Sequence, residues 1–259
     1  MNIPPTAVAA AGSDVTSRSR RLRATLSLTR SRLTELIREV WYHRRLGELY
    51  PEFLFATYGE TLASAPAMRR AADRCGELKG DPLCEQLQAY YLEHAEEERE
   101  HGEWILSDLA SLGISRERAL ERLPYPSVAA LVGTQYYWMQ HVHPVAYLGY
   151  IAVLEGPTDA DFLREVSERT GIPLSSMSSH LRHAELDPGH VAEFDAALDV
   201  LPLTREQEEL ITVSAITTVG HLEKVFADIL EHFERIWDPG LRKTLFTGRE
   251  SAAAAATRL

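Results

Sequence analysis

Apolar residues recur at intervals of three and four along most of this 259-residue chain, which places them on one face of an α-helix. Sustained alternation of apolar and polar residues, the mark of β-strands, is weak, and the sequence contains no Asn-Gly hairpin turn. The pattern therefore predicts an all-α protein. We expect helices over about 31–46, 51–74, 82–112, 127–155, 159–170 and 204–237, and a short helix that begins at 115. A further helix begins at about 175, is interrupted at Pro188 and then continues to 200.

Residues that start and stop helices support these boundaries. Asp81-Pro82 is a typical start, with an aspartate cap and proline at the first helical position. Thr204-Arg205-Glu206-Gln207 resembles a capping box, in which the first and fourth residues hydrogen-bond each other. Short connections without a repeat period predict one bundle. We expect three regions: a disordered or loosely helical tail over 1–29, the bundle over 30–240, and a C-terminal tail over 241–259.

Composition narrows the classes of function. The formal charge of −11 argues against nucleic-acid binding, which favours a basic surface. The sequence shows no unbroken apolar run near the roughly 20 residues that span a bilayer. Its two cysteines, Cys75 and Cys84, are typical of reduced thiols in a cytosolic protein. We therefore expect a cytoplasmic protein that binds neither nucleic acid nor membrane.

The segment from 183 to 190 carries the strongest candidate chemistry. His183, Asp187 and His190 stand four and three residues apart, so one helical face would hold two imidazoles and a carboxylate. In the alternative interpretation, Asp187-Pro188 starts a new helix and Asp187 is its cap. A helix broken at Pro188 still leaves His183 and Asp187 in one turn. We expect such a broken segment to be the least ordered part of the site when metal is absent.

A second candidate lies within the helix expected over 82–112. Glu98 and His101 stand three residues apart on a stripe that has apolar residues at both ends. An inward Glu-x-x-His pair is a recurring ligand unit of carboxylate-bridged di-iron bundles. His94 and Glu97 flank this pair and are alternative ligands. The competing interpretation is a Glu-rich surface helix with a single histidine.

Glu155 ends the most apolar segment of the chain and shares a helical face with Ile151 and Leu148. A carboxylate on a buried stripe is costly unless it is paired or bound to metal. Alternatively, the helix frays before Gly156 and lets Glu155 reach solvent. Imidazoles and carboxylates together suit iron or manganese, whereas a structural zinc site favours cysteine.

The order Glu98-x-x-His101, Glu155, His183-x-x-x-Asp187-x-x-His190 resembles the haem-oxygenase-like di-iron oxidases and oxygenases, including bacterial iron-containing redox enzymes. The resemblance covers residues 30–240 and implies a single haem-oxygenase-like bundle of about seven or more helices. It implies that these six residues ligate two iron ions per chain, as Fe(II)/Fe(III), with O2 as co-substrate. Some members carry a carboxylate where this chain has His94, so the choice among His94, Glu97 and Glu98 stays open.

The activity implied by the resemblance is that of an O2-activating non-haem di-iron oxidoreductase. Its substrate would be a small amino-acid-like or carboxylic acid, and its chemistry C–C cleavage, desaturation or N-oxygenation in a specialised biosynthesis. An external electron donor and a homodimeric state are further expectations. Two alternatives remain: a ferritin-type iron-storage protein, and a metal-free haem-oxygenase-like protein for ligand binding or cofactor biosynthesis. Candidate substrate contacts are Tyr91, Tyr136, Tyr137 and Arg182.

Overall fold

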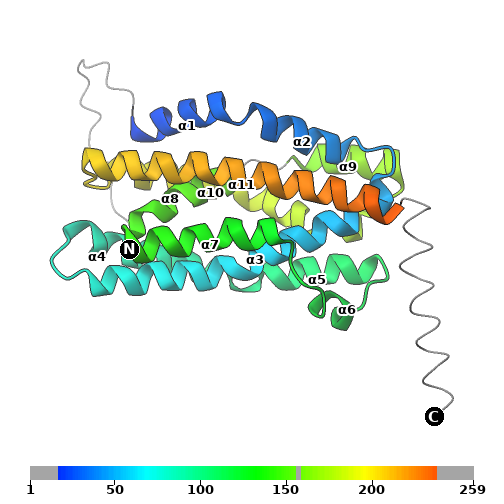
Figure 1. The fold of residues 1–259 in the computed structure, drawn as a ribbon, viewed down its shortest axis with the longest axis horizontal. Coiled ribbons are helices and arrows are strands. Elements are labelled where there is room, and N and C mark those ends of the chain that lie inside the picture. The colour runs from blue at the N-terminus through cyan, green and yellow to red at the C-terminus, as the bar shows by residue number, and fades with distance from the viewer. Residues whose placement is uncertain (1–16, 156–158, 238–259) are drawn as a thin grey trace, which may run out of the picture.

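The computed structural model describes residues 17–155 and 159–237, apart from the side chains at positions 187, 188, 236 and 237. The all-α prediction is confirmed: these ranges contain helices joined by short turns and no strand (Figure 1). The α-helices are α1 Arg18–Thr29, α2 Ser31–Trp41, α3 Leu46–Glu77, α4 Pro82–Glu97, α5 His101–Ser111, α6 Arg116–Leu120, α7 Pro126–His141, α8 Tyr147–Leu154, α9 Ala160–Thr170, α10 Ser178–Val200 and α11 Arg205–Trp237. Three 3-10 turns join them: η1 Glu98–Glu100, η2 Pro144–Ala146 and η3 Leu174–Ser176.

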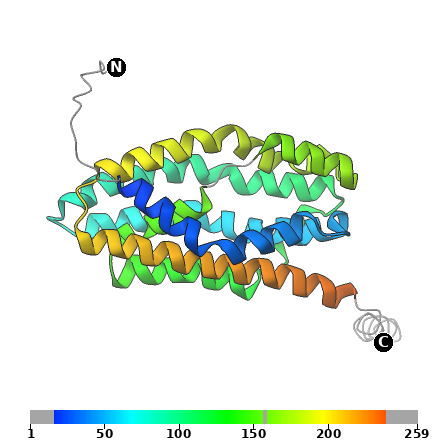
Figure 2. The ribbon, with the colours of Figure 1, turned by 90° about the horizontal axis from the view of Figure 1, so that it is seen from above.

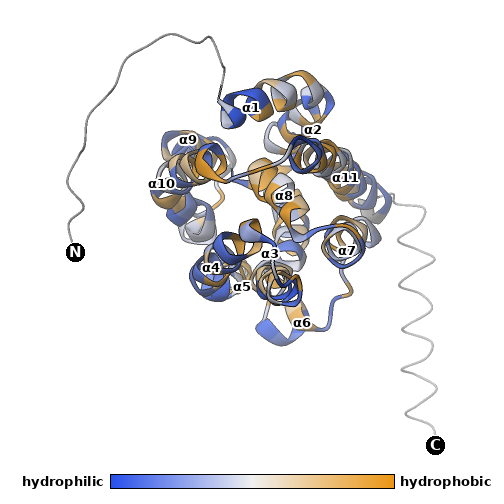
Figure 3. Cartoon of the chain, turned by 90° about the vertical axis from the view of Figure 1, so that its left-hand side faces the viewer, coloured by the Kyte–Doolittle hydropathy of each residue, from blue (hydrophilic) through white to orange (hydrophobic). Residues whose placement is uncertain are grey.

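Helix α8 lies in the middle of the bundle, with the longer helices around it (Figure 3). All residues from Tyr147 to Ala152 are buried, because a helix that is apolar on every side is stable only when other helices surround it. The long helices α3 and α11 run along the bundle (Figure 2). Helix α3 packs against α4, α5 and α7, and α11 packs against α8, α7 and α2.

Gly149 allows α8 and α11 to approach each other closely. A Cβ atom at this position would lie 2.3 Å from the carbonyl oxygen of Ile211 and 2.7 Å from the nitrogen of Ala215. Both atoms belong to the backbone, so a larger side chain would push the two helices apart. This contact fixes α8, and therefore the position of Glu155 at its C-terminal end.

Two of the expected helices are each divided in two. The helix expected over 82–112 is interrupted by η1, where four glutamates lie within residues 96–100 and like charges at helical spacing disfavour an α-helix. The helix expected over 127–155 stops before His143, because Pro144 has no backbone N–H to continue the ladder. The Nδ1 atom of His143 accepts a hydrogen bond from the Val145 N–H and caps the following turn.

The predicted interruption at Pro188 is wrong. The backbone of α10 is helical throughout residues 178–200, so Asp187 is not the cap of a new helix and no break separates His183 from His190. The proline leaves one carbonyl group in the preceding turn without its helical partner. The packing of α10 against α1, α5 and α9 maintains the helix in spite of that loss.

The N-terminal region is more ordered than expected over residues 18–29. These residues, expected to belong to a tail, form α1, whose Leu22 and Leu26 are buried. Arg23 of α1 forms an ion pair with Asp195 of α10, and Asp199 accepts hydrogen bonds from the backbone and the hydroxyl of Ser19. Residues 1–16 and 241–259 lie outside the described part of the chain.

Helix α11 starts as predicted. The side chain of Gln207 accepts from the Thr204 N–H, and the Thr204 hydroxyl accepts from the Gln207 N–H, so the capping box is confirmed. By length and composition alone, its segment Arg205–Arg235 would pass as a membrane-spanning helix. Polar residues recur throughout this segment, so the sequence shows no unbroken apolar run there. In the bundle its residues Ile211, Ala215 and Val219 are buried against the neighbouring helices.

Candidate metal centre

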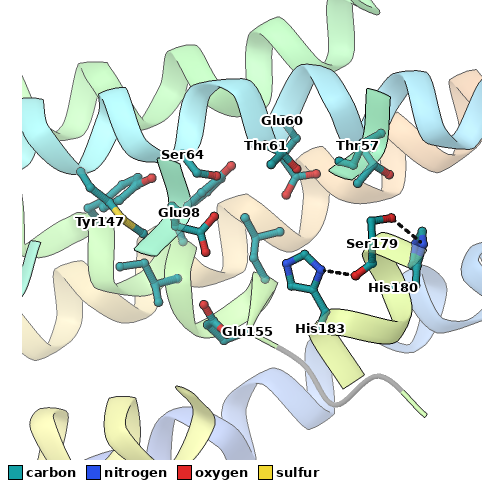
Figure 4. Close-up of a pocket in the computed structure, with 15 residues that line it drawn as sticks. Thr57, Glu60, Thr61, Ser64, Glu98, Tyr147, Glu155, Ser179, His180 and His183 are labelled. Atoms are coloured by element: carbon teal, nitrogen blue, oxygen red, sulfur yellow. Dashed lines mark hydrogen bonds between the residues drawn. The ribbon is translucent and has the colours of Figure 1, made fainter. Parts of the chain in front are cut away.

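A cavity of about 200 Å³ lies between α3, α8 and α10, beside the junction of α4 with α5. Figure 4 shows the side chains of Glu60, Glu98, Glu155 and His183 directed toward one another across it. Three of these residues were predicted, and Glu60 was not. The remaining polar residues of the lining are Thr57, Thr61, Ser64, Tyr147, Tyr150, Ser179 and His180.

The pair Glu98 and His101 lies at the division between α4 and α5. The Nδ1 atom of His101 is 3.1 Å from Oε1 of Glu98, and the imidazole side chain is only 3% exposed. This buried nitrogen nevertheless has no hydrogen-bond partner among the described residues. Two ligand atoms that bind one metal ion at a right angle, each about 2.1 Å from it, are about 3 Å apart. The unsatisfied nitrogen beside a carboxylate oxygen therefore fits a shared cation better than a hydrogen bond.

His183 approaches the same place from α10. Its Nδ1–H donates to the backbone carbonyl of Ser179 at 2.8 Å, so the neutral imidazole keeps its lone pair on Nε2 (Figure 4). Metal-binding histidines usually have this arrangement, in which one nitrogen binds the backbone and the other binds the ion. The His183 and His101 rings are perpendicular, with centroids 4.9 Å apart.

Asp108 fixes the start of α10 relative to α5. Its fully buried carboxylate accepts hydrogen bonds from the backbone N–H groups of Ser178 and Ser179, both at 3.0 Å, and from both hydroxyls. Ser179 in turn orients His183, while His101 lies two turns before Asp108 on the same helix. Asp108 therefore holds the two histidine-bearing helices in register. Sequence reasoning missed this residue.

Glu60 adds a third carboxylate to the cavity from α3. Burial raises its pKa from the ordinary 4.5 to about 7, and the negative charge of Glu98 adds to the effect. A signal for it exists in the sequence: Thr57, Glu60 and Ser64 form a polar stripe at helical spacing on a helix that is otherwise apolar in its inward positions. That is the same type of pattern that identified Glu98.

Glu155 follows α8, and its carboxylate lines the cavity. Its Oε2 atom is 3.7 Å from Nδ1 of His190, and each side chain is less than a fifth exposed, at 18% and 17%. The expected fraying of α8 beyond Leu154 does not release this carboxylate to solvent. The backbone of Asp187 lies on α10 between the two histidines, and its side chain lies outside the described part of the structure.

Glu98 lines the cavity, whereas the alternative ligands His94 and Glu97 are not among its lining residues. His94 donates from Nδ1 to the carbonyl of Tyr90 at 2.8 Å, and the two rings are in contact with centroids 3.9 Å apart. Glu97 is exposed, whereas Glu98 is half-buried and lines the cavity.

The four candidate substrate contacts do not line the cavity among the described residues. The hydroxyl of Tyr91 donates to the carbonyl of Pro144 at 2.9 Å, and Tyr137 is 58% exposed. Arg182 lies over the ring of Trp104, and Tyr136 packs against the apolar core. A better placed group is the Tyr147 hydroxyl, which lines the cavity, is buried and has no hydrogen-bond partner in the described part of the chain.

A second group of possible metal ligands lies at the α3–α4 hairpin, and we call it the hairpin cluster. It consists of Asp81, Cys84 and His143, whose ligand atoms lie within 4.8 Å of one another. Its polar atoms already have partners. Because Nδ1 of His143 accepts from the Val145 N–H, the neutral ring carries its proton on Nε2, which donates to Oδ2 of Asp81 at 3.0 Å. The other carboxylate oxygen of Asp81 caps α4 through the Leu83 N–H.

Comparison with known proteins agrees with this architecture. The sequence profile of the iron-containing redox enzymes matches residues 77–219, more than half of the chain. A domain of unknown function with a heme oxygenase-like fold from Shewanella denitrificans is 21% identical, with a TM-score of 0.67 over 86% of this chain and 92% of that one. No protein of curated function matches the sequence.

Two further structures share the fold. A TenA homolog from Pseudomonas syringae is 13% identical, with a TM-score of 0.63 over 83% of this chain and 93% of that chain. A TenA homologue from P. horikoshii is also 13% identical, with a TM-score of 0.54 over 83% and 98%. These likenesses show that the chain has the haem-oxygenase-like fold, as the sequence motifs predicted.

Proposed function

This chain belongs to the family of iron-containing redox enzymes, and we propose that it is a cytoplasmic, O2-activating non-haem di-iron oxidase or oxygenase of a small organic molecule. One observation carries the proposal. Carboxylates from three separate segments, Glu60, Glu98 and Glu155, line one cavity with His183, and beside them a buried nitrogen of His101 makes no hydrogen bond to the described residues.

The donor set fits iron. Glu60, Glu98, His101 and His183 would hold one ion, and Glu155 and His190, together with Asp187, would hold the second. Mixed imidazole and carboxylate ligands suit iron, and neither Cys75 nor Cys84 is among the residues that line this cavity. Iron bound there would supply the redox chemistry of O2 reduction and substrate oxidation.

The chain itself would prepare the cavity for these ions. The hydrogen bond from His183 to Ser179 directs Nε2 of the imidazole inward. The raised pKa of Glu60 means that this carboxyl holds a proton near neutral pH until a cation replaces it. The Tyr147 hydroxyl would then donate a hydrogen bond to a polar group of the substrate, because it has no partner among the described residues.

A metal-free function like that of a ligand-binding protein fits the cavity less well. TenA homologues share the fold at 13% identity, which is a likeness of architecture alone. Three carboxylates around a small cavity repel one another, and desolvation adds to that cost, so such a group is favourable chiefly when it surrounds a cation.

Anaerobic titration with Fe(II) followed by elemental analysis tests the first part of the proposal. We expect about two iron ions per chain, and fewer than about one would overturn it. The second part is tested by O2 consumption of the loaded protein in the presence of candidate organic substrates. Consumption that depends on the substrate, with formation of an oxidised product, supports an oxidase or oxygenase. Consumption that follows added iron alone would assign iron storage instead.

A further inference from the structure

Two neighbouring helices on one side of the bundle lack charged residues over long stretches. Residues 126–141, which form α7, and residues 210–222 of α11 contain no aspartate, glutamate, lysine or arginine, although these types make up 25% of the chain. The two helices pack against each other, and they lie on the same outer side of the bundle (Figure 3). We call their exposed surface the uncharged face, and it consists of Ala130, Gly133, Tyr137, Val213, Ile216 and Gly220.

A contact at the surface joins the two halves of the uncharged face. Nε2 of His221 in α11 lies 3.0 Å from the hydroxyl of Thr134 in α7, and both side chains are partly exposed. On α7, Ala130 and Tyr137 lie one turn to either side of Thr134. On α11, Gly220 immediately precedes His221. The exposed residues of the two helices therefore flank the same contact and form one continuous surface.

The interior of the bundle accounts for only part of the apolar character of α11. No more than 39% of the most apolar stretch of this helix is buried. The exposed fraction is 47% for Val213, 41% for Ile216 and 58% for Tyr137. The outer side of a helix normally carries charged residues, whereas the centre of a protein–protein interface is poor in charge and rich in aromatic residues. The uncharged face therefore has the composition of an interface.

Two glycines on this face support that interpretation. Glycine destabilises the interior of a helix relative to alanine. A Cβ atom at Gly133 or Gly220 would nevertheless meet no described atom within 4 Å. No close contact within the described part of the chain therefore requires a glycine at these positions, whereas the close approach of another backbone would require one.

The charges at the two ends of α11 indicate which partner fits. Exposed positions follow one another at helical spacing from 205 through 209, 213, 216 and 220 to 224. Arg205 forms an ion pair with Glu209 at one end of this stripe, and Lys224 forms one with Asp228 at the other end. Along the helix the stripe therefore reads positive, negative, uncharged, positive, negative.

An antiparallel copy of the same helix complements this order of charges. Glu209 and Lys224 lie equally far on either side of the point between residues 216 and 217, and so do Arg205 and Asp228. A two-fold axis through that point places Glu209 opposite Lys224 of the second copy, and Arg205 opposite Asp228 of the second copy. A parallel copy would instead place each charge opposite its own kind, which is unfavourable. The side chains of Glu209 and Lys224 are 62% and 61% exposed, so both are accessible to a partner.

We propose that the uncharged face is the interface of a homodimer, in which α11 packs antiparallel against α11 of a second copy about a two-fold axis beside Ile216. The stripe of α11 is about 35 Å long, the uncharged part of α7 is about 25 Å long, and each helix is about 10 Å wide. Together they offer roughly 600 Å² per chain, or about 1,200 Å² for two copies, which is the lower end of the range for specific interfaces. The inference does not depend on the metal centre.

A membrane surface matches the uncharged face less well than a second copy does. Helices that bind at a membrane surface carry lysine and arginine beside their apolar side, where they meet anionic lipids. The stripe of α11 has charges of both signs at each end, and the whole chain has a formal charge of −11. These charges favour a protein surface of complementary pattern.

Sedimentation equilibrium of the full, metal-free chain tests the inference. We expect a monomer–dimer equilibrium with a Kd at or below about 10 µM. Ile216→Lys places two like charges beside the axis and should weaken the dimer at least about 100-fold. The matched control is Leu92→Lys, because Leu92 is 46% exposed and belongs to α4 on the other side of the bundle (Figure 3); it should leave the Kd unchanged. A chain that stays monomeric at about 100 µM, or equal effects of the two variants, would overturn the inference.

Charge reversal tests the antiparallel arrangement and covers the case in which Ile216→Lys does not fold. Glu209→Lys and Lys224→Glu should each weaken the dimer about tenfold, because each places like charges opposite one another in both symmetry-related pairs. Combined in one chain, they restore opposite charges and should recover most of the wild-type affinity. A double variant as weak as the single variants would contradict the inference.

Cosedimentation with vesicles of phosphatidylcholine and phosphatidylglycerol decides between a second copy and a membrane. We expect no binding of the chain to these vesicles. Binding that Ile216→Lys abolishes and Leu92→Lys does not would assign the uncharged face to a membrane and overturn the inference.

Discussion

The candidate metal centre and the hairpin cluster each place a histidine beside a carboxylate, yet the histidine nitrogens differ in the hydrogen bonds that they make. In the hairpin cluster, His143 uses both ring nitrogens in hydrogen bonds, to Asp81 and to the Val145 N–H. In the candidate metal centre, the buried Nδ1 atom of His101 lies 3.1 Å from Glu98 without forming a hydrogen bond, and His183 uses only Nδ1 in its hydrogen bond to Ser179.

We propose that this difference separates a structural role, in the hairpin cluster, from a metal-binding role in the cavity. The ligand atoms of the hairpin cluster lie within 4.8 Å of one another. They are close because Asp81 already accepts hydrogen bonds from His143 and from the Leu83 N–H, which caps α4. An unsatisfied buried polar group costs about 1–3 kcal/mol, so it persists chiefly where a ligand satisfies it. On the proposed function, the hydrogen bonds that a group already makes are a better guide to a metal site than the distance between ligand atoms.

The largest effect should come from the histidines of the metal centre. We expect His101→Ala and His183→Ala each to lower Fe(II) affinity by at least about 100-fold, because each removes a direct ligand. His143→Ala in the hairpin cluster is the matched control and should keep the wild-type iron content. Anaerobic Fe(II) titration measures all three. Loss of iron from His143→Ala, with iron retained by His101→Ala and His183→Ala, would show that the hairpin cluster binds the metal and the cavity does not.

Asp108→Asn should have the next largest effect, although Asp108 does not line the cavity among the described residues. The amide cannot accept all the hydrogen bonds from Ser178 and Ser179, so the start of α10 would shift and misplace His183. We expect a loss of about 10–100-fold in Fe(II) affinity. Thermal unfolding should also show a destabilisation of about 2–4 kcal/mol. Unchanged iron affinity in a destabilised variant would limit Asp108 to a structural role.

The raised pKa of Glu60 predicts how the stability of the metal-free protein depends on pH. Its pKa of about 7 in the folded protein exceeds the ordinary 4.5, so the folded state binds this proton more tightly than the unfolded state. Stability should therefore fall as pH rises from 4.5 to 7, by roughly 1–3 kcal/mol from this group.

The variant Glu60→Gln isolates that contribution. It should flatten this part of the pH profile and make the metal-free protein more stable at pH 8, while weakening iron binding. Chemical denaturation at several pH values measures the effect. A profile identical to that of the wild type would show that Glu60 does not experience the buried, negative environment seen in the cavity.

The smallest effect should come from the hairpin cluster. Asp81→Ala removes the cap of α4 and the partner of His143, and we expect a destabilisation of about 1 kcal/mol. Iron content should not change. A fall in iron content that exceeds the loss of folded protein would give the hairpin cluster a metal-binding role.

The sequence predicted the helical class and most helix boundaries because helical periodicity and caps are local properties. Gly171, with its positive φ of 74°, ends α9 as expected, and the Thr204 capping box starts α11. The breaks at Glu98–Glu100 and before Pro144 have local causes, like charges and a missing N–H, which apolar periodicity does not report. The continuity of α10 through Pro188 depends on packing between helices.

The candidate site was predicted in part for a similar reason. Glu98 and Glu155 were found by their positions on apolar stripes, and His183 by its helical spacing to Asp187 and His190; all three line the cavity. Glu60 lies on a comparable stripe of α3 and was missed because it has no histidine nearby to form a familiar motif. Asp108 acts through hydrogen bonds to another helix, so no local pattern identifies it.

The most direct test of the central claim is the anomalous diffraction signal at the iron edge from crystals soaked anaerobically in Fe(II). We expect iron within about 2–2.5 Å of Nδ1 of His101 and Nε2 of His183, between the carboxylates of Glu60 and Glu98, with no signal at Asp81, Cys84 and His143. A signal at the hairpin cluster and none in the cavity would contradict the account.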